Sequence, residues 1–420
     1  MINIVESSPD IRVGIGFATG RRHFRQVLNT YVYNWKESEL TEGNNVSLSL
    51  LVAYDLQYSN TRPAHYTNIK KDVLELLSDV YFIGIPDIQR EIGYLLSENV
   101  IDEREAQLFF GTGYAAQRNV VLYMAMKNKI DYLLFLDDDE YPMAVTKANS
   151  NAIWHGQQVL STHLNSIMDA DITNGHHCGY VSPVPYIEFN EIMSETDFRM
   201  FIEAISNDVI TWDSVRSVMN NGGITYADID ILLNKVVEEV PETKNTKFIT
   251  GANLCINLTR PERVHPFYNP PGARGEDAFL STCLGEAKVL RVPCYAFHDG
   301  FSTYHHLMDG VLPIKLKYIT ADSDAVVDRF YKACIGWIRY KPLLIYITQR
   351  ENYDSEIGEI REKLSATLPK ISAYFGNNEF MKISRELERY HKNVERHYQQ
   401  YLDTQQIWTK IGEFLNRTPS

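Results

Sequence analysis

Strand-like and helix-like segments alternate along the first third of this 420-residue chain. Short apolar runs predict strands, and each is followed by a longer stretch in which apolar residues recur every three or four positions. This alternation favours an α/β fold with a mostly parallel central sheet and helices on both faces, because a parallel strand needs a crossover to reach its neighbour. The predicted strands are residues 11–17, 46–54, 80–85 and 132–136, and the predicted helices are residues 22–35, 69–77 and 114–127.

The chain is less regular after residue 145. Residues 179–187 and 248–258 predict further strands, and the polar, acidic stretch between them, 188–241, predicts a helical insertion. From residue 321 the sequence becomes helical and rich in Glu, Lys, Arg and Tyr. We therefore expect two halves of one α/β domain, 1–145 and 146–320, followed by a C-terminal helical region, 321–420.

Composition limits the partners that we expect. With 41 Lys and Arg against 54 Asp and Glu, the formal charge of −13 argues against binding to nucleic acid. Five widely spaced cysteines without a CxxC pair indicate a reducing compartment, so we expect a cytoplasmic protein. The first ten residues lack signal-peptide features, and no run of about 18 apolar residues predicts a spanning helix.

Two segments of the C-terminal region allow further partners. Residues 337–347 are basic and aromatic, a composition that suits either a core segment or peripheral contact with a membrane. Residues 380–414 carry apolar and tyrosine side chains at helical spacing, which suits packing on the chain's own domain or a homo-oligomer through the C-terminal helices.

The predicted strand at 132–136 ends in Asp137, Asp138, Asp139 and Glu140. So much negative charge at one strand end is repulsive, and a bound cation would relieve it; carboxylate oxygens suit Mg²⁺ or Mn²⁺. If strand geometry continues, Asp137 and Asp139 point to the same side, so that one can touch a ribose while the other holds the metal. The alternative is a solvated acidic turn.

The sequence before this strand contains a second motif, which helps to interpret the acidic cluster. Gly111-Thr-Gly113-Tyr-Ala-Ala-Gln-Arg118-Asn119, a helix and then the acidic strand together resemble the corresponding run of family-2-like glycosyltransferases with the GT-A fold. The resemblance implies that Arg118 and Asn119 lie near a nucleotide, with Asp137 and Asp138. It also implies metal ligation by Asp139 and Asp137.

A later motif looks like the acceptor side of the same family. Gly251-Ala-Asn is followed by Gly275-Glu276-Asp277, where a Glu-Asp pair opens a helix. A carboxylate at this place is suited to take a proton from an acceptor hydroxyl, with Asp277 the first choice as general base and Glu276 the second. The alternative is a helix start, because carboxylates stabilise a helix N-terminus.

The resemblance also implies a late metal ligand, and His298, at the end of an apolar run, matches it. Asp299, His305 and His306 are the alternatives. Two early features depart from the family pattern. The first strand ends in Ala18-Thr19-Gly20-Arg21 where a proline and an aromatic residue are usual, and the second ends at Asp55 without the usual turn. We still expect Thr19, Arg21 and Asp55 to contact the nucleotide.

The sequence thus predicts a metal-dependent glycosyltransferase, in which residues 1–145 bind a nucleotide-diphosphate sugar and 146–320 bind the acceptor. It would use Mn²⁺ or Mg²⁺, take a UDP-sugar in preference to a GDP-sugar, and transfer the sugar with inversion to a carbohydrate or other hydroxyl. A retaining enzyme of the same fold and a catalytically degenerate nucleotide-binding scaffold are the alternatives. A nucleotidyltransferase fits less well, because residues 14–22 lack an early lysine in a glycine-rich loop.

Overall fold

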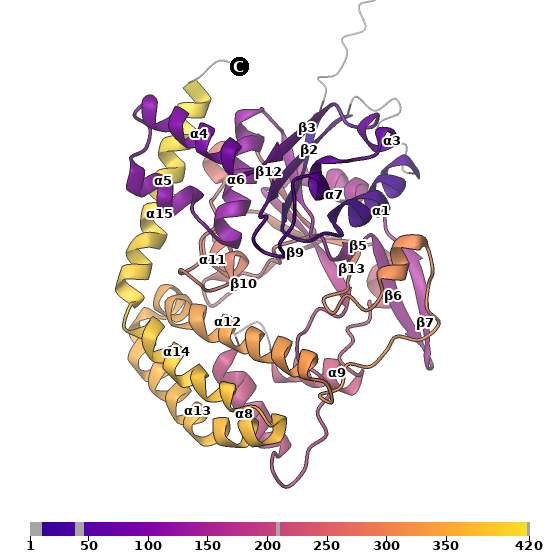
Figure 1. The fold of residues 1–420 in the computed structure, drawn as a ribbon, viewed down its shortest axis with the longest axis vertical. Coiled ribbons are helices and arrows are strands. Elements are labelled where there is room, and N and C mark those ends of the chain that lie inside the picture. Colours follow the sequence, from indigo (N-terminus) through magenta and orange to yellow (C-terminus); the bar gives the residue numbers. More distant parts are fainter. Residues whose placement is uncertain (1–10, 38–45, 207–210, 418–420) are drawn as a thin grey trace, which may run out of the picture.

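The computed structural model describes residues 11–37, 46–206 and 211–417 (Figure 1). The first ten residues, where no signal peptide is expected, and residues 207–210 of the predicted insertion lie outside this part. The described chain is an α/β protein with a mixed, mostly parallel central sheet and a C-terminal helical region. The predicted fold class is confirmed at this level.

The central sheet has the strand order β3-β2-β1-β4-β12-β8-β13-β5, with β9 paired to β13. β1 is parallel to β2 and β4, β2 to β3, and β8 to β13, whereas β12 runs antiparallel between β4 and β8. Because β2 and β4 lie on opposite sides of β1, the order reverses there and leaves a crevice at the carboxyl ends. The strands are β1 Ile11–Thr19, β2 Val46–Tyr54, β3 Asp79–Ile83, β4 Tyr132–Phe135, β5 Glu140–Tyr141, β8 Ile172–Gly179, β9 Glu238–Glu239, β12 Leu254–Asn257 and β13 Val289–His298.

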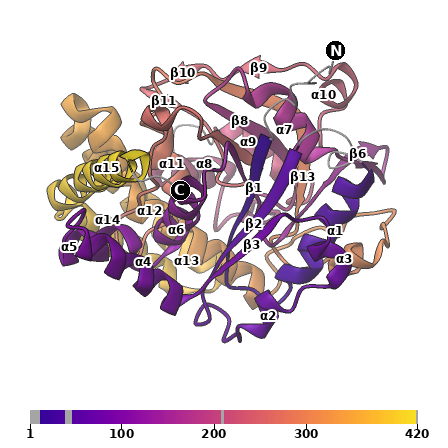
Figure 2. The same cartoon turned by 90° about the horizontal axis from the view of Figure 1, so that it is seen from above.

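Helices cover both faces of the sheet, with α1 on one side of β1–β3 and α4 and α6 on the other (Figure 2). α1 and α7 pack on the face that carries Val13, Ile15 and Phe17. α4, α5, α6 and the C-terminal helix α15 pack on the opposite face, which carries Leu51 and Leu133. The bounds of these helices are α1 Phe24–Glu37, α4 Ile85–Ser97, α5 Glu103–Phe110, α6 Tyr114–Lys127, α7 Val159–Ile167 and α15 Val394–Arg417.

Glycine lets α6 lie close to β1. A Cβ at Gly16 would lie 2.8 Å from Val121 Cγ1 of α6, and one at Gly14 would lie 3.0 Å from side-chain carbons of Leu51 and Ile130. Such approaches are tighter than close packing allows. β1 therefore carries large apolar side chains toward α1 and glycine toward α6, and this close fit holds the start of α6 at the crevice.

The C-terminal region has its own core. α12, α13 and α14 pack with α8 and α9 around buried side chains such as Phe198, Phe330 and Phe380. α15 then returns to the sheet half, where the Trp408 ring stacks on Phe109 at 5.9 Å between centroids; Figure 1 shows α15 beside α5. The bounds are α8 Glu195–Ile205, α9 Trp212–Asn220, α12 Asp324–Thr348, α13 Tyr353–Phe375 and α14 Lys382–His391.

The shorter elements lie in the connections. Two hairpins, β6–β7 and β10–β11, stand apart from the main sheet. The bounds are α2 Ala64–Thr67, α3 Lys71–Leu74, α10 Ile229–Asn234, α11 Glu276–Ser281, β6 Met143–Ala148, β7 Asn151–Gly156, β10 Glu242–Thr243 and β11 Thr246–Lys247.

The structure confirms some predicted elements and corrects others. β2 and α6 have the predicted bounds, and α8, α9 and α10 lie in the predicted helical insertion. The predicted strand 179–187 is wrong: β8 ends at residue 179, and Pro183 and Pro185 cannot donate to a ladder. Helices α4 and α5 were not predicted, and the helix expected at 69–77 is reduced to α3.

No helix in the described ranges has the length and apolar character needed to cross a membrane. Residues 337–347 lie within α12, where Ile338, Leu343 and Ile345 are buried in the C-terminal core. Of the two roles considered for this segment, the structure therefore favours a core segment over contact with a membrane surface.

Candidate active site

A cleft of about 860 Å³ opens at the carboxyl ends of β1, β2 and β4. Its sheet-side wall consists of the loops after β1 and β2, the start of α6 and the acidic turn after β4. The start of α11, whose Glu276 pairs with Arg118 of α6, belongs to this sheet-side wall, and the other wall consists of α9 and one face of α12. All the predicted site residues except Asn119 line this cleft, namely Thr19, Arg21, Asp55, Arg118, Asp137, Asp138, Asp139, Glu276, Asp277 and His298.

The acidic turn does not continue strand β4, which ends before it. Asp138 and Asp139 both pair with Arg21, Asp138 Oδ1 lying 2.9 Å from its Nη1. Thr19 Oγ1 donates a short hydrogen bond to Asp138 Oδ2. The expectation that Asp137 and Asp139 share one side assumed that strand geometry continues, and it is wrong because Asp139 shares its partner with Asp138 in a turn, whereas Asp137 pairs with Arg118.

His298, at the end of β13, contacts the acidic turn. Its Nε2 lies 3.4 Å from Asp139 Oδ2, and its Nδ1 lies 2.8 Å from the carbonyl oxygen of Tyr180. A carbonyl only accepts, so Nδ1 carries the proton in that bond. Burial alone would lower the pKa of His298, but Asp139 outweighs it, and the pKa is raised to about 9. Burial would raise the pKa of Asp139, but His298 and Arg21 hold it below its ordinary value.

Arg118 joins three of the predicted motifs. Its Nη2 lies 3.2 Å from Asp137 Oδ1, its Nε lies 3.4 Å from Glu276 Oε1, and its Nη1 donates to the carbonyl oxygen of Gly251. Burial would lower the pKa of Arg118, but the surrounding carboxylates raise it. Burial also raises the pKa of Asp137, although Arg118 opposes this. One buried guanidinium thus holds the acidic turn, the Glu-Asp motif and the Gly251 loop together.

Asp277 follows Glu276 at the start of α11. Gly275 precedes them at a φ of +94°, and a Cβ there would lie 2.8 Å from the Tyr340 ring, so the chain needs glycine to enter the helix here. Burial and the neighbouring charge of Glu276 raise the pKa of Asp277 to about 6. A carboxylate with a raised pKa accepts a proton more readily, as a general base must.

Asp55 connects the loops after β1 and β2. Its backbone N–H donates to the carbonyl oxygen of Thr19 at 2.8 Å, and its Oδ1 accepts a hydrogen bond from Gln57 N at 2.8 Å. The two loops therefore form one edge of the cleft, and Asp55 lies on it.

Asn119 does not line the cleft. Its Nδ2 donates to the carbonyl oxygen of Phe267 at 2.9 Å, and its Oδ1 accepts from Phe267 N at 2.8 Å. Because the backbone of Phe267 occupies both ends of the buried amide, Asn119 fixes that loop against α6. We correct its expected role from a nucleotide contact to this positioning one.

The residues considered as alternatives to His298 for the late metal ligand are Asp299, His305 and His306. Asp299 accepts hydrogen bonds from the backbone N–H groups of Thr303 and Tyr304 at 2.9 and 2.7 Å, so it shapes the following turn. The His306 ring packs edge-on against Tyr304. The side chain of His305 lies outside the described part of the structure. Of the described candidates, His298 lines the cleft.

Asp139 and His298 provide a carboxylate oxygen and an imidazole nitrogen, both of which are ligand types for divalent cations. Their Oδ2 and Nε2 are 3.4 Å apart, and two ligands at that spacing can both reach an ion at about 2.1 Å. Because Nδ1 donates to a backbone carbonyl, Nε2 is the nitrogen that would ligate, and it would first have to lose the proton that a pKa of about 9 keeps on the ring at neutral pH. Within the described ranges no three His, Cys, Asp or Glu side chains form a complete metal site. A cation would need further oxygen ligands, and Arg21 would have to release Asp139.

The sequence did not reveal the second wall of the cleft. Helix α12 lines it with residues spaced three or four apart, which was the signal available: Ala325, Asp328, Arg329, Lys332, Ala333, Trp337 and Tyr340. Aromatic residues also line the sheet side, where the rings of Tyr58 and Tyr114 meet edge-on at 6.1 Å. Arg274, next to the Glu-Asp motif, was missed as well.

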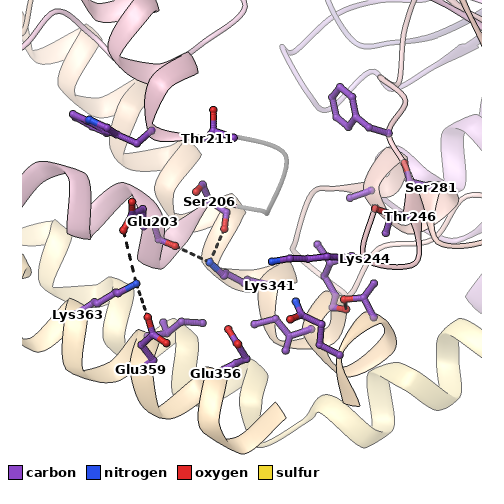
Figure 3. Close-up of a pocket in the computed structure, with 18 of the residues that line it drawn as sticks. Glu203, Ser206, Thr211, Lys244, Thr246, Ser281, Lys341, Glu356, Glu359 and Lys363 are labelled. Atoms are coloured by element: carbon purple, nitrogen blue, oxygen red, sulfur yellow. Dashed lines mark hydrogen bonds and ion pairs between the residues drawn. The ribbon is translucent and has the colours of Figure 1, made fainter. Parts of the chain in front are cut away.

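A second cavity, of about 520 Å³, lies between α8, α12 and α13 (Figure 3). Lys341 Nζ donates to the carbonyl oxygens of Glu203 and Ser206, and Lys363 Nζ pairs with Glu359 at 2.7 Å. Lys341 and Lys363 are therefore bound to groups of the cavity's own wall, and the cavity contains none of the predicted site residues. We therefore take the cleft at the sheet as the candidate active site.

Comparison with known proteins adds no family assignment. No protein-family model matches the chain, and no curated protein is significantly similar to it in sequence.

Proposed function

We propose that this protein is a glycosyltransferase of the GT-A type, which moves a sugar from a nucleoside-diphosphate donor to a hydroxyl acceptor. The observation that carries the proposal is the meeting of separate motifs in one cleft. Six features that are far apart in the sequence all line this cleft: the ends of β1 and β2, the Arg118 helix, the acidic turn, the Glu-Asp pair and His298. The cleft lies at the carboxyl ends of the strands where their order reverses, which is where such sheets bind ligands.

The proposed division of labour follows from the contacts. The loops that carry Arg21 and Asp55 would hold the nucleoside at the sheet edge. Arg118 keeps Asp137 and Glu276 in place and so fixes the acidic turn relative to the acceptor motif. Asp277 would take the proton from the acceptor hydroxyl as that oxygen attacks the anomeric carbon, which leads to inversion.

The proposed metal is Mn²⁺ or Mg²⁺, held by Asp139 and His298, with Asp137 nearby in the acidic turn. When bound, such an ion stabilises negative charge on the leaving diphosphate. The largely buried carboxylates of Asp138 and Asp139 pair with Arg21, and the protein's own contribution is to keep these groups oriented.

The direct test is release of nucleotide from a panel of UDP-sugars, GDP-sugars and other activated sugars, with water as acceptor and Mn²⁺ or Mg²⁺ present. We expect one donor, a UDP-sugar first, to be hydrolysed slowly in a metal-dependent way. A change in anomeric configuration of the released sugar supports inversion, and retention would remove Asp277 as the base. No hydrolysis of any donor would contradict the proposed activity.

A binding measurement distinguishes the proposed enzyme from a catalytically degenerate scaffold. Nucleoside diphosphates should raise the thermal stability only when Mn²⁺ or Mg²⁺ is present, and ligand at about 100 times its dissociation constant should add roughly 2.7 kcal/mol. A metal-dependent shift without hydrolysis or transfer would favour the scaffold, and no shift with any nucleotide would remove the nucleotide site altogether.

A further inference from the structure

Helix α12 presents two cationic side chains to the cleft, and they differ in their partners. Lys332 Nζ pairs with Asp328 at 2.6 Å, so its charge is matched one helical turn away. Arg329 forms no ion pair within 4.0 Å among the described residues, and its Nε is buried without a hydrogen-bond partner. A guanidinium has five N–H donors, so Arg329 has donors available that the protein does not use.

The contacts of Arg329 hold its position without neutralising it. Its Cζ lies 4.2 Å from the ring centroid of Phe301, in the loop that follows His298. A Cβ on Gly300 would overlap its Nη2, so glycine is what lets the guanidinium lie against this backbone. A ring face orients a guanidinium by stacking and leaves the edge, with its N–H groups, open to a ligand.

A second cation without an ion-pair partner among the described residues lies on the same cleft. Arg274, just before the Glu-Asp motif, is exposed, and its Cζ lies 5.5 Å from the ring centroid of Tyr114. Burial lowers the pKa of Arg329 to about 10, and the positive charges of Arg21 and Arg274 add to this effect although Asp139 opposes it. Arg329 and Arg274 therefore line the same cleft as the acidic turn, and neither has a carboxylate within 4.0 Å among the described residues.

We propose that Arg329 and Arg274 bind the diphosphate of the nucleoside-diphosphate donor and stabilise it as the leaving group. Guanidinium groups match phosphate oxygens with paired hydrogen bonds. A diphosphate has enough oxygens to accept hydrogen bonds from both Arg329 and Arg274 and also to bind a cation at the acidic turn. A single carboxylate, with two oxygens, does not. This inference rests on the proposed function, since it names the part of the donor that α12 recognises.

The test is calorimetric titration of the full chain, at a fixed free Mg²⁺ concentration, with inorganic pyrophosphate, UDP, UMP and uridine. We expect Arg329→Gln and Arg274→Gln each to weaken pyrophosphate and UDP binding by about 10–100-fold, the usual loss when a charged hydrogen-bond donor is removed. Binding of uridine should be unchanged. Lys332→Gln is the matched control, and its paired, exposed charge should change affinity by less than about threefold.

The outcomes separate this inference from the function on which it rests. If UDP binds and both arginine variants bind it as tightly as the native protein, or if UMP and uridine lose as much affinity as UDP, the diphosphate assignment is overturned. If no nucleotide binds but pyrophosphate does so through Arg329, the anion site stands and the nucleotide function fails. Arg274→Gln changes an exposed side chain, so it keeps the test valid if Arg329→Gln does not fold.

Discussion

The two walls of the cleft differ in whether their arginine side chains form ion pairs within the protein. On the sheet side, Arg21 pairs with Asp138 and Asp139, and Arg118 pairs with Asp137 and Glu276. On the α12 side, Arg329 is held by an aromatic ring, without a carboxylate partner among the described residues. The comparison suggests that the sheet side is organised by its own ion pairs before any ligand binds, whereas α12 supplies charge that a ligand would match.

The largest expected effect is on the sheet side, at the proposed base. Asp277→Asn keeps the size and hydrogen-bonding reach of the side chain but cannot accept the acceptor's proton. Transfer at saturating donor should fall by about 10²–10⁴-fold, the usual contribution of a positioned base, while donor binding persists. The measurement is the transfer rate with the donor identified by nucleotide release.

Glu276→Gln is the control for this change, because Glu276 lies beside Asp277 but contacts Arg118. It should slow transfer less than Asp277→Asn does. An Asp277→Asn enzyme with nearly normal transfer and an inactive Glu276→Gln enzyme would reverse the two roles. If neither change slows transfer, the Glu-Asp pair only starts α11.

The next effect concerns the cation. Asp139→Ala removes the carboxylate shared by His298 and Arg21, so nucleotide affinity in Mn²⁺ should fall by about 100-fold and lose its metal dependence. Asp138→Ala should weaken binding less, because Asp138 acts through Thr19 and Arg21. Binding with and without Mn²⁺ checks both variants. Metal-dependent affinity retained in Asp139→Ala would remove Asp139 as a ligand.

Substitutions of arginine in the two walls should differ in their effect on the free energy of unfolding. Arg118→Met leaves Asp137 and Glu276 without their buried partner, which typically costs about 3–5 kcal/mol; since Asp137 is partly exposed, we expect the lower end of that range. Arg329→Met removes the ion-pair partner of no described carboxylate, so the free energy of unfolding should change by less than about 1 kcal/mol. Urea unfolding at neutral pH measures both. Equal losses would mean that the two walls are not built differently.

The smallest expected effect is the pH dependence of transfer. The pKa of Asp277 is raised to about 6, so its carboxylate gains a proton as the pH falls through 6. A base works only when deprotonated, so the transfer rate at saturating donor should fall by about tenfold for each unit below pH 6. Donor binding measured at the same pH values separates this from loss of affinity. A rate that stays level down to pH 4.5 would exclude Asp277 as a base with a raised pKa.

The same contrast explains what the sequence could predict. The bounds of β2 and α6 could be predicted because each is a largely apolar, almost wholly buried segment, with a polar residue or glycine directly beyond its ends. The acidic turn and the Glu-Asp pair stand out as local motifs, and the structure brings them to one cleft. The directions of Asp137, Asp138 and Asp139 could not be predicted, since they depend on a turn and on Arg21, more than a hundred residues earlier.

The α12 wall lay beyond local patterns for a physical reason. In the sequence, Arg329 and Arg274 look like ordinary charged residues of a helix and a loop. They line the cleft only because the C-terminal core packs α12 across the sheet edge. Asn119 shows the opposite case, because a motif residue that looks like a ligand contact is occupied by the backbone of Phe267. Tertiary packing decides both.

The central claim is that the sheet side and α12 together form one nucleotide-sugar site. The most direct measurement is a crystal structure of the full chain with Mn²⁺ and the nucleoside diphosphate identified by nucleotide release. We predict that the nucleotide lies between the Arg21 loop and the acidic turn, with its diphosphate within hydrogen-bonding distance of Arg329. A nucleotide bound elsewhere, in the cavity beside Lys341 for example, would contradict the account.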